Sequence, residues 1–221
     1  MSGPQPAKGP PQRIVLNGRY VRLEPLAERH VPSLYDAASA PGAEDRFRYL
    51  AGSSAPRDKA DVARWVELAQ ATDDPLRFAV VDSATGRCGG YQSLMRIVPE
   101  HGVIEIGGIM WGPGVARTRL ATEALYLCAT YIFDDLGYRR FEWKCNAQNA
   151  PSRRAAERFG FTFEGIFRQH MIVEGRNRDS AWFAMLDGDW PRLRAEYERW
   201  LEPANFEADG TQKTRLAAGA A

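Results

Sequence analysis

The stretch Val103–Leu136, which reads VIEIGGIMWGPGVARTRLATEALYLCATYIFDDL, decides how the chain folds. It begins with a mostly apolar run that carries one carboxylate, passes through a turn rich in glycine and proline, and ends in a long helical pattern. This pattern predicts a strand over 103–111, a turn over 112–119 and a helix that begins near Leu120. The three elements form a strand–loop–helix unit around which we expect the rest of the chain to be organised.

The turn before this helix has features of a phosphate-binding site. A helix start presents unsatisfied backbone N–H groups and the positive end of the helix dipole, an arrangement that binds phosphate. Arg117 and Arg119 lie in the same turn. Neither G-x-x-x-x-G-K-[ST] nor G-x-G-x-x-G follows the strand, so the common nucleotide fingerprints are absent. A plain strand–loop–helix connection explains these residues equally well, and both interpretations stay open at this point.

The composition is that of an ordinary globular protein. The 221 residues are 44% hydrophobic and 26% charged, and the formal net charge is +1. A surface dedicated to nucleic acid usually carries a strong basic excess, so we expect no nucleic-acid partner. No apolar run approaches the roughly 18 residues that a membrane span needs, and the chain does not open on a charged-then-apolar signal pattern. We therefore expect a cytoplasmic protein with no membrane partner.

The cysteines and histidines do not form a recognisable metal or disulfide pattern. There is no C-x-x-C spacing and no histidine pair at i, i+4, and the cysteine count is odd. We expect the cysteines to be small buried apolar residues and expect no metal site. The six residues are Cys88, Cys128, Cys145, His30, His101 and His170.

Periodicity and turn residues predict the remaining elements. The segment 41–56, rich in small residues, is predicted to be a loop. The other elements are a strand or hairpin over 14–23 around Asn17-Gly18, helices over 28–38 and 59–71, strands over 78–81, 88–96 and 140–146, a short helix after Asn149, strands over 161–173 and 179–186, and a last helix from Asp189.

This order of elements predicts the fold class and the domain limits. Antiparallel hairpins alternate with two strand–helix–strand crossovers, so we expect an α/β protein with a central mixed sheet flanked by helices. Residues 1–13 are predicted to be a disordered leader, 14–201 a single domain and 202–221 a flexible tail.

Two segments carry a resemblance to a known family. Ala121-Thr122-Glu123-Ala124 opens the central helix, and Asn149-x-x-Ser152 is followed by Arg158-Phe159-Gly160-Phe161 and then Gly165. Together with the order of elements, they resemble the GCN5-related N-acetyltransferase (GNAT) superfamily, over roughly residues 12–200. The segments 175–182 and 189–191 resemble its RimJ/RimL-like branch, which acetylates the N-termini of ribosomal proteins.

The resemblance implies a fold, an activity and a cosubstrate. It implies the GNAT acyl-CoA N-acyltransferase fold, acetyl-CoA as donor and a primary amine as acceptor, either a peptide N-terminus or a small molecule. The protein is expected to be a monomer or homodimer. The residues that match cofactor-binding positions are Ile109, Met110, Trp111, Ala116, Arg117, Thr118, Arg119, Leu120, Ala121, Thr122, Asn149 and Ser152.

The phosphate loop departs from the family pattern. The usual Q/R-x-x-G-x-G/A falls on Ala116–Ala121, and only the last position fits. The missing glycine predicts either less room for a diphosphate or a backbone at Arg119 that avoids positive φ. Two hypotheses follow: a working acetyltransferase with a variant loop, or a non-catalytic acyl-CoA-binding module with a degraded one.

The chemistry of amide formation needs a base, an oxyanion donor and a proton for the departing thiolate. Glu105 is the expected base, because an isolated carboxylate among apolar neighbours should have a raised pKa; Glu164 is the second choice. The Met110 amide is the implied oxyanion donor, and Ser152 the implied partner of the thiolate. Alternatively, Glu105 lies on an exposed face without a role, and Asn149 and Ser152 only cap a helix.

The acceptor pocket is expected on the side opposite the cofactor. The loop 42–56, the helix that carries Trp65 and the strands around Trp182 are predicted to shape it. The residues leave the acceptor itself open among peptide N-termini, polyamines and amino sugars, because fold does not fix substrate.

Overall fold

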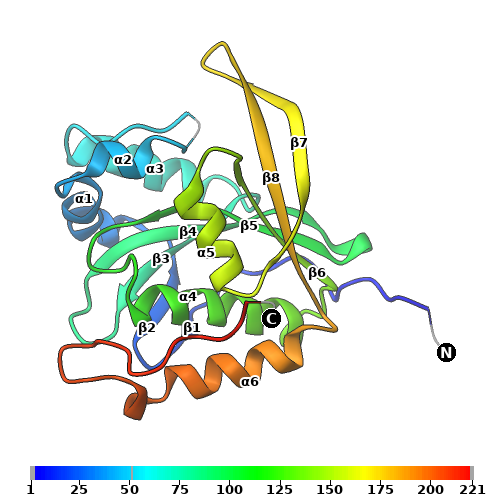
Figure 1. The fold of residues 1–221 in the computed structure, drawn as a ribbon. Helices are drawn as coiled ribbons and strands as arrows, with labels where there is room; N and C mark the ends of the chain where they lie inside the picture. The colour runs from blue at the N-terminus through cyan, green and yellow to red at the C-terminus, as the bar shows by residue number, and fades with distance from the viewer. Residues whose placement is uncertain (1–2, 51, 220–221) are drawn as a thin grey trace. The chain divides into compact units, whose positions relative to one another are not determined.

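The computed structural model describes residues 3–50 and 52–219 (Figure 1). The chain divides into two compact units. Unit 1 consists of Met1–Pro10, Val98–Glu105 and Ile132–Ala221, and unit 2 consists of Pro11–Ile97 and Ile106–Tyr131. Strand β5, Val103–Trp111, contributes to both.

The strands of unit 2 follow one another in space in the order β1-β2-β3-β4-β5. The pairs β1–β2, β2–β3 and β3–β4 are antiparallel. The predicted hairpin around Asn17-Gly18 is confirmed, with Leu16 opposite Leu23. The bounds are β1 Leu16–Asn17, β2 Val21–Pro25, β3 Leu76–Asp82 and β4 Cys88–Val98.

The helices of unit 2 confirm the predictions with one exception. A 3-10 turn, η1 Glu28–His30, leads into α1 Val31–Ser39; α3 is Lys59–Gln70 and α4 Arg119–Thr130. The predicted cap of α3 is present, since Asp58 accepts a hydrogen bond from the Asp61 amide at 2.9 Å. The loop predicted over 41–56 is wrong at α2, Ala43–Phe47. Five residues are too few to show helical periodicity.

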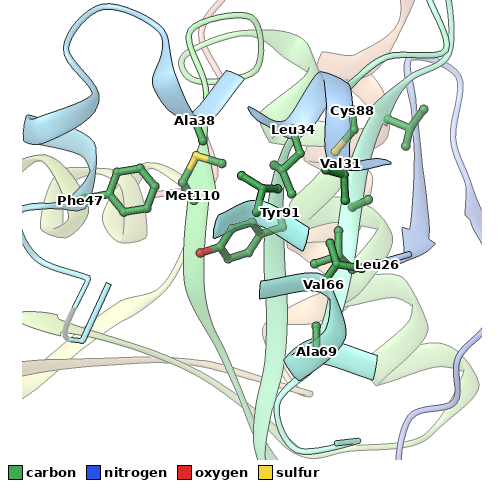
Figure 2. Packing of buried hydrophobic residues seen from close by; sticks show 13 residues of the cluster. Leu26, Val31, Leu34, Ala38, Phe47, Val66, Ala69, Cys88, Tyr91 and Met110 are labelled. Atoms are coloured by element: carbon green, nitrogen blue, oxygen red, sulfur yellow. The ribbon is translucent and has the colours of Figure 1, made fainter. Parts of the chain in front are cut away.

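A buried apolar cluster joins α1, α2 and α3 to the sheet of unit 2. Figure 2 shows Met110 of β5 beside Ala38 of α1, with Phe47 of α2 next to them. Tyr91 of β4 belongs to the same cluster, whereas its neighbour Gln92 bonds to α4. Because neighbouring strand residues point to opposite faces, α4 covers the face of the sheet opposite α1 and α3.

The strands of unit 1 follow the order β5-β6-β8-β7, and β6 and β7 each pair with β8 in antiparallel fashion. The β7–β8 hairpin turns at Glu174 and Gly175, both with positive φ (50° and 72°), as tight hairpin turns require. The elements are η2 Pro99–His101, a π-helical turn Tyr131–Asp135 that begins in unit 2, β6 Arg140–Asn146, α5 Ala150–Arg158, β7 Thr162–Val173, β8 Arg176–Leu186, α6 Trp190–Leu201 and η4 Pro203–Asn205.

Among the described residues, eight strands and their flanking helices confirm the predicted α/β class with a mixed sheet. Strands β5 and β6 are neighbours joined through α4, the kind of crossover that adjacent parallel strands need. No helix among the described residues is long and apolar enough to cross a membrane. All three cysteines are buried with free thiols, as expected.

The described segments near the two ends of the chain make more contacts than their composition suggests. The Ala7 amide donates to the Pro99 carbonyl and the Lys8 amide to the Leu136 carbonyl, each at 2.9 Å. Near the other end, the side chain of Asn205 bonds to Trp200, and Ala218 is fully buried. The division into leader, domain and tail stays a prediction, but these contacts differ from the disorder and flexibility expected of the two ends.

Candidate functional site

The loop between β5 and α4 is held by its own backbone, within unit 2. The amides of Val115 and Ala116 both donate to the Gly112 carbonyl, at 3.0 and 2.9 Å. Thr118 is the N-cap of α4, and its hydroxyl accepts from the Leu120 amide at 3.1 Å. The loop therefore delivers a capped helix N-terminus directly after the central strand, as the sequence predicts.

The backbone constraint in this loop lies at Arg117, not at Arg119. Arg117 is exposed and has a φ of 64°, in the left-handed region that costs a non-glycine residue about 1–2 kcal/mol. Arg119 is the first residue of α4 and needs no such conformation. The family's glycine is missing at Arg119, but the helical backbone there suits any residue, so its absence imposes no strain. The left-handed residue of the loop is Arg117, two positions earlier.

The first turns of α4 are tied to the β1–β2 hairpin. The Arg119 guanidinium lies 4.4 Å from the centre of the Tyr20 ring. The buried Glu123 carboxylate accepts the backbone amides of Arg19, Tyr20 and Val21 at 2.9, 2.5 and 2.8 Å. Three hydrogen bonds to one carboxylate fix the hairpin against the helix that carries the phosphate loop.

The part of β5 in unit 2 passes very close to β4. A Cβ at Gly90 would lie 2.3 Å from the Met110 carbonyl oxygen, so only glycine allows this approach. The Trp111 indole donates to Gln92 at 3.2 Å, and the Gln92 amide donates to the Ala124 carbonyl of α4 at 3.0 Å. Gln92 thus links the strand of the predicted thioester site to the helix of the predicted phosphate site.

Glu105 is buried and lies beside a lysine, within unit 1. Its Oε2 is 3.5 Å from Nζ of Lys144, and the two side chains are 3% and 7% exposed. The alternative that Glu105 lies on an exposed face is therefore wrong. The expectation of an isolated carboxylate is also wrong, because the Lys144 ammonium lies beside it. Lys144 lies 39 positions away, so local sequence patterns could not reveal this pairing.

One aromatic side chain, Trp182 of β8, faces Lys144 and belongs to a small aromatic cluster on β7 and β8. Lys144 is paired with Trp182 across the β6–β8 ladder, and its Nζ lies 5.2 Å from the centre of the indole. The Trp182 ring packs against Phe167 at 4.9 Å and against His170 at 5.9 Å. The strands around Trp182, predicted to shape the acceptor pocket, thus present an aromatic cluster next to the Glu105–Lys144 pair.

Ser152 is held by two neighbours at the start of α5. Its amide donates to Asn149 Oδ1 at 3.1 Å, which confirms Asn149 as the helix cap. Its hydroxyl oxygen accepts a hydrogen bond from the Trp143 indole at 3.0 Å. Burial raises the pKa of the Cys145 thiol, and a hydrogen bond with Ser152 acts in the opposite direction. The sequence did not indicate Trp143 or Cys145 as neighbours of Ser152.

Strand β6 separates these two groups by its alternation. Trp143 and Cys145 are buried on the face that meets Ser152. Lys144, between them, points to the opposite face, where Glu105 and Trp182 lie. Glu105, the candidate base, and Ser152, the candidate partner of the thiolate, therefore lie next to opposite faces of β6.

Glu164 is less suited to act as the base. It is exposed on β7 and binds the Arg140 guanidinium through both carboxylate oxygens, one at 2.8 Å. The Arg140 side chain lowers the pKa of Glu164, which makes it a poorer proton acceptor at neutral pH. Among residues 3–50 and 52–219, no cluster of His, Cys, Asp and Glu is suited to hold a metal ion.

Comparisons with known proteins agree with this architecture. The family described as "Acetyltransferase (GNAT) domain" matches residues 21–162. A solved GCN5-related N-acetyltransferase from Brucella melitensis is 54% identical, with 96% of each chain covered and a TM-score of 0.92. A solved probable acetyltransferase of the GNAT family from Chromobacterium violaceum is 38% identical over 86% of this chain and 94% of that one, with a TM-score of 0.77.

A curated relative matches over a shorter segment. The uncharacterized N-acetyltransferase p20 of Bacillus licheniformis is 29% identical over 118 residues, which cover 52% of this chain and 64% of that protein. The chain thus spans less than two thirds of that relative's length. The family match covers more than half of the chain, and the chain therefore belongs to the GNAT family of acetyltransferases.

Proposed function

We propose that the chain is an acetyltransferase that moves the acetyl group of acetyl-CoA directly to a primary amine. The observation that carries the proposal is the capped N-terminus of α4 immediately after β5, in a chain of the GNAT family. The N-terminus of α4 and the two arginines of residues 116–122 bind the diphosphate. Residues 109–111 extend along the pantetheine arm as a neighbouring strand would.

Three groups share the chemistry in this proposal. Glu105 takes the proton of the acceptor amine, directly or through water, so that the neutral amine can attack the thioester. The Met110 amide donates to the oxyanion that forms on the carbonyl. Ser152 donates a hydrogen bond to the sulfur as the thiolate leaves. No acyl-enzyme is needed, because the amine attacks the thioester itself.

The contact with Trp143 suits Ser152 to this role. An indole N–H can only donate, so the Ser152 oxygen accepts from Trp143 and this contact does not use the hydroxyl proton. The aromatic rings of Phe159 and Phe161 pack against Trp143 at 6.1 and 5.7 Å and fix its orientation. Trp143 is therefore a positioning residue for Ser152.

We expect Ser152→Ala to lower kcat about tenfold to a hundredfold, while the Kd for CoA changes less. Trp143→Phe keeps the ring but removes the N–H, and we expect it to lower kcat about fivefold to tenfold. In the Ser152→Ala background, Trp143→Phe should have no further effect on kcat. If the two losses in kcat add in steady-state kinetics, Trp143 acts on stability alone. If Ser152→Ala mainly weakens CoA binding, Ser152 is only a binding contact.

Replacing Arg117 by glycine should increase the stability of the fold and weaken the binding of CoA. Arg117→Gly removes the left-handed constraint, so we expect unfolding to cost about 1 kcal/mol more in urea titrations. The same change removes a guanidinium from the diphosphate site, so the Kd for CoA should rise about tenfold in calorimetry. An unchanged Kd would remove Arg117 from the cofactor site. Arg117→Lys, which keeps the charge, is the matched control.

The acceptor is a peptide N-terminus or a small-molecule amine, and we place the protein with the RimJ/RimL-like branch on the segments 175–182 and 189–191. A cytoplasmic location and a monomeric or homodimeric state complete the proposal. The deciding experiment combines calorimetry of CoA with thiol release from acetyl-CoA in a panel of peptides, polyamines and amino sugars. CoA binding without release for any amine would favour the non-catalytic acyl-CoA-binding module, which the unusual residues 116–120 suggest.

A further inference from the structure

We infer that Lys144 is an internal acceptor and that the protein acetylates its own Lys144 side chain. The inference rests on the proposed function, because it uses acetyl-CoA as donor and Glu105 as base. Lys144 carries a primary amine, the same chemical group as the proposed acceptor. Its Nζ lies 3.5 Å from the carboxylate that would take the proton of an acceptor amine.

The surroundings of the Lys144 ammonium are those that would recognise an incoming substrate ammonium. A carboxylate lies on one side, and the face of the Trp182 indole lies 5.2 Å away. A carboxylate and an aromatic face are the two groups that proteins commonly use to hold an alkylammonium ion. Lys144 thus takes the place of a substrate amine while no acceptor is bound.

The lysine and its carboxylate are enclosed, as the reaction requires. Their side chains are only 7% and 3% exposed, so little water competes with the amine for the thioester. Any external acceptor that uses Glu105 must enter the same enclosure. A donor that is able to react with such an acceptor is therefore within reach of Lys144 as well.

The reaction balances without a further reagent. Glu105 takes one proton from the Lys144 ammonium, and the neutral Nζ attacks the thioester carbonyl carbon. The new N–C bond forms, the C–S bond breaks, and the CoA thiolate leaves with the second proton lost from nitrogen. The products are Nζ-acetyl-Lys144 and CoA. The acetylated side chain has no charge, so the ion pair with Glu105 is lost.

The lysine content of the chain makes the test unusually clear. The sequence contains four lysines, Lys8, Lys59, Lys144 and Lys213. The other three are exposed on the surface, whereas Lys144 is enclosed. Uncatalysed acetylation by a thioester favours accessible amines, so the three exposed lysines report the chemical background in the same sample.

The experiment incubates the full chain with acetyl-CoA that carries an isotopically labelled acetyl group, without added amine. Peptide mapping by mass spectrometry then follows label at each lysine over time. We expect Lys144 to gain one labelled acetyl group at least about a hundredfold faster than the same residue in urea-denatured protein, and faster than the three exposed lysines. Protein is also mapped before incubation, to count acetyl groups acquired during expression.

Two variants separate catalysis from accessibility. Glu105→Gln should slow labelling of Lys144 about a hundredfold and leave the background at the exposed lysines unchanged. Lys59→Arg, at an exposed site, should leave labelling of Lys144 unchanged. Circular dichroism confirms that each variant is folded, and Lys144→Arg shows how much of the total label the one site accounts for.

The outcomes distinguish this inference from the proposed function. Labelling of Lys144 no faster than in the denatured chain, or equal labelling of all four lysines, overturns the inference. If an amine of the panel is acetylated while Lys144 stays unlabelled, the inference fails and the proposed function stands. If calorimetry detects no CoA binding and neither the panel nor Lys144 is acetylated, both fail.

Discussion

Replacing Glu105 by glutamine is expected to lower kcat at neutral pH by about a hundredfold or more, with little change in the Kd for CoA. The reason is that an amide of the same shape cannot take the proton of the acceptor amine, and general-base assistance contributes about 10²–10⁴ in rate. Glu105 and the phosphate loop are separate parts of the proposed site, so cofactor binding should survive. Initial rates of thiol release, with calorimetry on the same samples, check both statements.

The Glu105→Gln variant also loses the counter-charge of Lys144. Removing one partner of a buried ion pair costs about 3–5 kcal/mol when it leaves the other charge uncompensated. Rates must therefore be referred to the folded fraction, measured by circular dichroism. The matched control is Glu164→Gln, which removes an exposed ion-paired carboxylate on β7. If Glu164→Gln abolishes the rate and Glu105→Gln does not, the assignment of the base is reversed.

Replacing Gly90 by alanine is expected to give a large loss of stability. The new Cβ would lie 2.3 Å from the Met110 carbonyl oxygen and 2.9 Å from the Trp111 Cα, and both atoms belong to the backbone. No side-chain rotation relieves such a contact, so strands β4 and β5 must move apart. We expect a loss of about 3 kcal/mol or more in the free energy of unfolding, read from urea titrations.

The same substitution displaces the strand that is proposed to hold the thioester. We therefore expect Gly90→Ala to weaken CoA binding at least about tenfold under conditions where the variant is still folded. The matched control is Gly114→Ala in the loop before α4, where an added Cβ meets no atom within 4 Å. Equal effects of the two substitutions, or wild-type binding by Gly90→Ala, would show that the close approach of β4 and β5 does not support the site.

Elements set by local chemistry were predictable from the sequence. Asn17-Gly18 marks a hairpin because asparagine and glycine are typical turn residues, and Asp58 and Asn149 mark helix starts because their side chains cap free amides. Helix α2 was missed because its five residues carry no period and its N-cap, Gly42, has no side chain to identify it.

Contacts made across the fold were not predictable in the same way. The partner of Glu105 comes from β6, and strand alternation alone assigns Lys144 to a face without saying what lies opposite. The left-handed residue of the loop is Arg117, although the family pattern pointed to Arg119. The ion pair depends on how two segments far apart in the chain pack together. The positive φ of Arg117 depends on the turns that the whole loop makes.

The Glu123 carboxylate, which accepts three amides of the β1–β2 hairpin, has a consequence for how cofactor binding can be observed. Those amide protons exchange with solvent only when the hairpin separates from α4. A ligand that stabilises the start of α4 makes this opening rarer, so the protons of Arg19, Tyr20 and Val21 exchange with deuterium more slowly. A short edge hairpin, which need not touch the ligand itself, then reports the occupancy of the phosphate loop.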